Sequence, residues 1–115
     1  MQHLETFYII SLITQLFHSV EELSTGFHKK WYLSTMPFWV FLLFEVVFSL
    51  FWIGVYLYKD FPYREALQIS FLILMFINGI QHVIWWRFKK KYVPGLITAF
   101  LHVLIVSIFY FINFR

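Results

Sequence analysis

Residues 37–58 read PFWVFLLFEVVFSLFWIGVYLY, and this stretch decides the class of fold. Glu45 is the only charged residue in it. About 20 apolar residues are enough for a helix to cross the roughly 30 Å of hydrocarbon in a bilayer. A segment surrounded by lipid must satisfy its own backbone hydrogen bonds, which a helix does internally. The stretch therefore predicts a transmembrane helix.

Three more apolar segments of similar length share the chain with this one. The four predicted helices span residues 4–24, 37–58, 62–86 and 94–114. Three of them begin at a proline, which is tolerated in the first turn because the N–H groups there lack intrahelical partners. The short connections between them make successive helices antiparallel neighbours. We therefore expect one all-α domain, residues 1–115, folded as an up-down-up-down four-helix transmembrane bundle.

The composition supports a membrane protein and excludes several other classes. Hydrophobic residues make up 61% of the chain and aromatic residues 24%. Charged residues make up only 13%, against roughly 25% in soluble domains. This excludes a soluble, a disordered or a nucleic-acid-binding domain. The absence of cysteine excludes disulfides, Cys-ligated metal and a cysteine nucleophile. We expect a multi-pass protein of the cell membrane whose main partner is the lipid bilayer, with its oligomeric state left open.

The distribution of lysine and arginine predicts the orientation of the bundle, because cytoplasmic loops are enriched in both. The first and third connections lie on one side and carry six basic residues: Lys29, Lys30, Arg87, Lys89, Lys90 and Lys91. The other side carries Lys59, Arg64 and Arg115. We therefore expect both termini outside the cell. The run Lys89, Lys90 and Lys91 also forms a candidate site for anionic lipid headgroups, although anchoring at the membrane surface explains it as well.

Each predicted helix carries a polar residue where lipid would make it costly. An ionisable side chain at the centre of a span costs about 2.5–3.5 kcal/mol on insertion scales. His18, Glu45, His82 and His102 lie one on each helix. At 1.5 Å of rise per residue, each lies about 8–12 Å from the cytoplasmic edge. Their matched depths predict that these side chains converge in one polar layer inside the cytoplasmic half of the bundle.

Helical spacing places further polar residues on the same faces. Gln15, His18 and Glu22 share one stripe of the first helix. Glu21 diverges from Glu22 by about 100°, so only one of them faces the bundle axis, and the stripe favours Glu22. Asn78 and Gln81 accompany His82 on the third helix, and Thr98 accompanies His102 on the fourth. We expect Gln15, Asn78, Gln81 and Thr98 to support the layer through hydrogen bonds.

The residue types in this layer leave several functions open. Imidazole and carboxylate groups without thiolate suit zinc, iron or manganese, with His18, Glu22, His82 and His102 as candidate ligands. Glu21, Glu22 and Glu45 are candidate catalytic groups, with or without metal, for acid–base chemistry on a lipid-like substrate. The alternatives are a non-enzymatic transport subunit with a proton or metal-ion path, and a structural subunit in which the layer only bonds helices together.

Two short motifs give the sequence a family resemblance. His18-Ser19-Val20-Glu21-Glu22 forms H-x-x-E-E, and Tyr92-Val93-Pro94-Gly95 forms Y-x-P-G at the start of the last helix. Through these two motifs the chain resembles the HXXEE-domain integral membrane proteins. The resemblance extends from the first helix to the start of the last one, which is most of the chain. A further histidine of that family would map to His82 or His102. The resemblance implies a site built from these residues but no particular reaction, because the family has no established biochemical function.

Overall fold

The computed structural model describes residues 1–114. All of the regular secondary structure in that range is helical. The long helices are α1 (Leu4–Ser24), α3 (Phe38–Leu57), α4 (Arg64–Lys89) and α5 (Leu96–Phe114), and a short helix, α2 (Phe27–Lys30), lies between the first two. Arg115, which was counted in the predicted orientation, lies outside the described residues. The predicted all-α class is confirmed.

The helix boundaries differ from the predicted ones mainly around the prolines and in the third connection. Pro37 is the N-cap of α3 rather than its first residue, while Pro62 and Pro94 precede α4 and α5 by two residues. Helix α4 continues three residues past the predicted end at Trp86 and stops where Lys90 takes a left-handed conformation (φ 58°). Helix α2 was not predicted, because four residues give too little periodicity to recognise.

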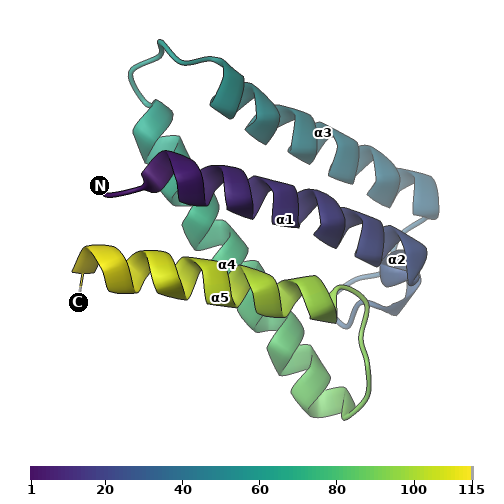
Figure 1. Cartoon of the computed structure of the whole chain (residues 1–115). Helices are drawn as coiled ribbons and strands as arrows, with labels where there is room; N and C mark the ends of the chain where they lie inside the picture. Colours follow the sequence, from purple (N-terminus) through teal and green to yellow (C-terminus); the bar gives the residue numbers. More distant parts are fainter. Residues whose placement is uncertain (115) are drawn as a thin grey trace.

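The helices do not form a closed square bundle. Helix α1 lies between α3 and α5, and α4 crosses them obliquely (Figure 1). Helix α1 contacts α3, α4 and α5, whereas α3 and α5 make no contact with each other within residues 1–114. The crossing of α4 and α5 is close, because a Cβ at Gly79 would lie 2.8 Å from the Ala99 carbonyl oxygen. Helix α3 packs only against α1, α2 and α4 and less closely than the other long helices do, so it is the most loosely packed of them within residues 1–114.

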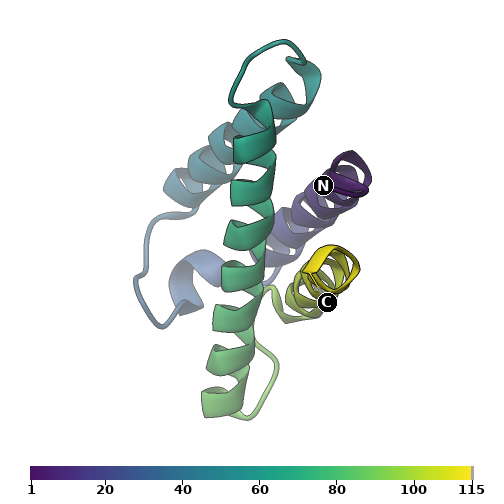
Figure 2. The same cartoon turned by 90° about the vertical axis from the view of Figure 1, so that its left-hand side faces the viewer.

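The start of α1 and the end of α5 lie at the same end of the molecule (Figures 1 and 2). The backbone N–H of Gln2 donates to the side chain of Asn113 at 2.8 Å, and Arg64 pairs with Glu5 at 2.7 Å. The 58–63 connection is at this end too, while α2 and the 90–95 connection lie at the opposite end. Successive long helices thus run in alternating directions.

Three of the long helices, α3, α4 and α5, are long and apolar enough to span a membrane, with mean hydropathies of 2.3, 1.7 and 2.1 in the residues described. The prediction of four such spans is wrong by this criterion, because α1 does not meet it. Its second half carries Gln15, His18, Glu21 and Glu22, which lower its hydropathy. The outward face of α1 is nevertheless apolar, since Ile13, Phe17 and Val20 are exposed there.

The buried polar side chains lie between two apolar clusters. One cluster packs α1, α3 and α4 together through Tyr8, Leu12, Trp52, Val55, Phe71 and Met75. The other surrounds the short helix and the 90–95 connection and contains Phe27, Phe41, Trp85, Val93 and Leu96. Because both clusters are built on the helices that carry the polar residues, they hold the polar layer in place from either side.

Candidate metal centre

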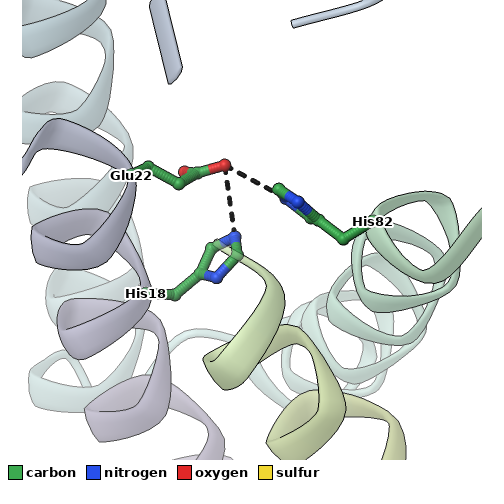
Figure 3. A group of neighbouring side chains, drawn as sticks. All are labelled: His18, Glu22 and His82. Carbon is green, nitrogen blue, oxygen red and sulfur yellow. Dashed lines mark ion pairs between the residues drawn. The ribbon is translucent and has the colours of Figure 1, made fainter. Parts of the chain in front are cut away.

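The side chains of His18, Glu22 and His82 meet in the interior of the protein. His18 and Glu22 lie one turn apart on α1, and His82 reaches them from α4 (Figure 3). The exposed fractions are 0%, 4% and 0%, respectively. One carboxylate oxygen of Glu22 lies 3.3 Å from His18 Nε2 and 3.1 Å from His82 Nε2. The three side chains thus bring two imidazole nitrogens and one carboxylate oxygen together in the interior.

The spacing of these three atoms is compatible with a metal ion held between them as well as with direct contacts from the two histidines to Glu22. All three lie within 4.8 Å of one another. Ligands about 2.0–2.1 Å from a tetrahedral zinc ion are roughly 3.3 Å apart, close to both distances to Glu22. His82 Nδ1 is buried without a hydrogen-bond partner in the described chain, whereas His82 Nε2 lies 3.1 Å from Glu22 as an ion pair. An ion held between His82 Nε2 and Glu22 would bind both groups at once.

The contact made by His18 Nδ1 determines which ring nitrogen of His18 can bind a metal. His18 Nδ1 lies 2.6 Å from the hydroxyl oxygen of Thr98, and that hydroxyl donates to a carboxylate oxygen of Glu21 at 2.7 Å. Because the single hydroxyl proton of Thr98 goes to Glu21, Nδ1 must be the protonated nitrogen. His18 Nε2 then carries a lone pair, which accepts a hydrogen bond from Asn78 Nδ2 at 3.1 Å and which an ion beside Glu22 would take in place of Asn78. A carboxylate that orients a metal-binding histidine in this way is a common device.

Glu21 caps the first turn of α5 while it fixes this arrangement. Its carboxylate accepts hydrogen bonds from the backbone N–H groups of Ile97 and Thr98 at 3.1 and 3.0 Å. These groups have no intrahelical partners, and the positive end of the helix dipole favours a carboxylate there. Of the two adjacent glutamates, Glu22 therefore faces the interior, as the helical stripe predicted, and Glu21 joins α1 to α5.

The Y-x-P-G motif contacts the H-x-x-E-E motif directly. The hydroxyl of Tyr92 donates to Glu21, and burial, followed by that hydrogen bond, raises the pKa of Tyr92. Gly95 has a φ of +88°, and a Cβ there would lie 2.7 Å from His82 Cε1 and 2.8 Å from His18 Cε1. The backbone at Gly95 therefore covers the cluster of His18, Glu22 and His82, and a Cβ at this position would clash with these side chains.

Glu45 and His102 lie beside the cluster but are not part of it. Glu45 is buried on α3 and accepts a hydrogen bond from the hydroxyl of Ser19. His102 is fully buried on α5, with its ring centre 5.4 Å from that of His18, and its Nε2 donates to Gln15 at 3.1 Å. Both thus face the interior as the matched depths predicted. The three-residue cluster does not include His102, so its role as a ligand stays a prediction.

The remaining predicted residues divide into two groups. Asn78 donates to His18 Nε2 at 3.1 Å, and Gln81 donates to Asn78 at 3.1 Å, so both belong to the network around the cluster. Lys89, Lys90 and Lys91 are exposed at the end of α4, and headgroup binding there stays a prediction. Ser19 was not assigned a role from the sequence. Its position, four residues after Gln15 on the polar stripe, is the signal that could have shown it.

Replacing Thr98 with valine should weaken metal binding without unfolding the protein. Valine removes the hydroxyl that links Glu21 to His18, so the imidazole loses its preferred tautomer and orientation. Loss of such a supporting group costs roughly 10–100-fold in metal affinity, which competition with a fluorescent chelator measures. Thr14→Val is the matched control: Thr14 is equally buried (both 8%), but its hydroxyl donates to the Ile10 carbonyl of its own helix. Equal affinities in the two variants would refute the role of Thr98.

A family of known proteins matches most of the chain. The family described as "protein of unknown function with HXXEE motif" matches residues 9–110, a range that includes all of the residues placed around the cluster. No curated protein and no solved structure matches the chain.

Proposed function

The chain belongs to this HXXEE-motif family of unknown function, and we propose that it is a membrane protein that binds one divalent transition metal ion through His18, Glu22 and His82. The observation that carries the proposal is the convergence of these three buried side chains on a common point. Two imidazoles and one carboxylate are ligands of zinc and of iron(II). The proposal therefore names the ligands and leaves the choice of metal to experiment.

In this proposal all four long helices lie in the bilayer, with the metal ion inside the protein. The apolar outward face of α1 supports this arrangement, because Phe17 and Val20 are more than half exposed (65% and 62%). The polar stripe of α1, which lowers its hydropathy, points toward α4 and α5 instead of toward lipid. Both termini then lie on one side of the membrane, and the excess of lysine and arginine at the opposite end favours a cytoplasmic location for that end.

We further propose that the centre is catalytic and acts on a lipid-like substrate. Three protein ligands leave a coordination position open, which is typical of catalytic and not of structural zinc sites. Glu22 and Glu45 both line a cavity of about 410 Å³ that lies beside the cluster. A bound ion would supply Lewis acidity at the inner end of this cavity. Glu45, which Ser19 holds in place, is the group that would accept or return a proton there.

The test is the metal content of the untagged protein. We expect about one equivalent of zinc, iron or manganese per chain after purification in detergent, measured by mass spectrometry of the elements. Removing the metal with a chelator should lower the melting temperature, because an ion that binds only the folded state stabilises it. If the protein carries no metal and all three ions leave its melting temperature unchanged, the metal centre is rejected. Metal-free acid–base chemistry by the same residues would then replace it.

A further inference from the structure

The cavity beside the metal-ligand cluster has an apolar wall and a polar inner end. Helix α3 supplies much of the wall through Phe41, Phe44 and Phe48. The inner end contains the side chains of Gln15, Glu22, Glu45, Asn78 and Gln81. A volume of about 410 Å³ lies within the range of small-molecule sites, and so does this combination of many apolar groups with few polar ones.

The outer side of this cavity lies between α3 and α4. Three of its lining residues are well exposed: Val40 (37%), Phe44 (57%) and Leu74 (40%). Both helices meet the criterion for a membrane span, so this side faces hydrocarbon in the proposed arrangement. A ligand that enters here comes from the bilayer and carries an apolar chain.

The polar end of the cavity favours an uncharged head that can donate a hydrogen bond. The lining residues, taken from the part of the chain that is described, include no lysine or arginine to bind a phosphate or a carboxylate. With a divalent ion bound at Glu22, the two positive charges of the ion balance the negative charges of Glu22 and Glu45, so the cavity has no net charge to favour an anionic or an ammonium head. A hydroxyl meets these requirements, because it donates to Glu45 and its oxygen has a lone pair for the ion.

We propose that this cavity binds the hydroxyl end of a long-chain alcohol, with the chain extending between α3 and α4 into the bilayer. The assignment of a hydroxyl rests on the metal centre proposed above. The location of the chain rests only on the cavity and on its exposed side between the two helices. This difference allows the two proposals to be tested separately.

Photolabelling of the full-length protein in nanodiscs tests the inference. The probe is a sixteen-carbon alcohol with a diazirine in its chain, and the labelled peptides are identified by mass spectrometry. We expect labelling at Phe44, Phe48 and Leu74, which face the cavity. Excess hexadecanol should reduce it by at least about tenfold, whereas hexadecyl phosphate and hexadecylamine should not. Labelling spread over all lipid-exposed residues alike, or equal competition by the amine or the phosphate, would overturn the proposal.

Matched tryptophan variants complete the test. Val40→Trp places an indole in the cavity and should lower labelling by about tenfold. Val47→Trp, on the same helix but outside the cavity lining, should not. If Val40→Trp does not fold, Leu74→Trp narrows the cavity from α4, with Leu50→Trp as its control. Undiminished labelling in the folded variant overturns the proposal.

Measuring the metal content of the same samples separates the two hypotheses. Labelling confined to the cavity in a protein that binds no metal rejects the metal centre and the choice of a hydroxyl, but retains the location of the chain. A metal-loaded protein whose cavity takes no label rejects the alcohol site and leaves the metal centre standing.

Discussion

Replacing His82 with alanine should abolish stoichiometric metal binding. His82 is one of the three proposed ligands, and of the three side chains it alone comes from α4. Its loss leaves two ligands on α1, which cannot enclose an ion. The loss of affinity should therefore exceed the roughly 10–100-fold that removal of a supporting group costs. Elemental analysis of the purified variant measures the effect.

Two other histidines provide the controls for that variant. His3→Ala alters an exposed residue at the start of α1 and should leave the metal content unchanged. His102→Ala removes a buried imidazole that donates to Gln15, so it should lower stability while the protein still binds metal. A His82→Ala protein that retains a full equivalent of metal would show that the ion is bound elsewhere or that His102 replaces the lost ligand.

Replacing Gly95 with alanine should damage both stability and metal binding. The backbone at Gly95 has a φ of +88°, and the new methyl group would lie 2.7 Å from His82 and 3.0 Å from Glu22 Cγ. Overpacking costs about 1–3 kcal/mol and an unfavourable backbone conformation adds about 1–2 kcal/mol. We therefore expect a decrease of about 2–5 kcal/mol in the free energy of unfolding, measured by denaturant titration, together with loss of the metal.

Gly54→Ala is the matched control for this substitution. Gly54 lies inside α3, and a Cβ there would meet nothing within 4 Å. Alanine favours a helix interior over glycine by up to about 1 kcal/mol, so this variant should be as stable as the natural protein or slightly more stable. If Gly95→Ala proves equally harmless, Gly95 does not cover the cluster as closely as described.

The close contact at Gly95 gives a physical reason for the two motifs to occur together. H-x-x-E-E places Glu22 in the ligand cluster and Glu21 at the start of α5. Y-x-P-G supplies the hydroxyl that holds Glu21 and the glycine that lies against the ligands. Neither motif could form this arrangement alone. The sequence spacing between them is large, and the antiparallel packing of α1 and α5 brings them together.

Much of the layer could be predicted because helix geometry is regular. Depth and helical stripe placed His18 and Glu22 on the inward face of α1 and His82 on the inward face of α4, and their burial agrees with that prediction. Only three of the four predicted spans meet a hydropathy criterion, because a polar stripe lowers the hydropathy of α1 as much as polar residues facing lipid would. Hydropathy alone does not record which face of a helix is buried.

Other details depend on contacts that spacing does not specify. The path from His18 through Thr98 to Glu21 joins residues 80 and 77 positions apart, and no local pattern predicts it. Helix α3 packs loosely, α4 crosses it obliquely (Figure 1), and residues of both helices line the cavity. A crossing angle arises from how side chains interlock over a whole interface, so the sequence pattern of a single helix does not determine it.

X-ray absorption spectroscopy of the metal-loaded protein tests the central claim most directly, because it reports the atoms around the ion. We expect nitrogen and oxygen neighbours at about 2.0–2.2 Å and the outer scattering of two imidazole rings, from His18 and His82. A spectrum with oxygen neighbours only, and no imidazole scattering, would contradict the proposed metal centre.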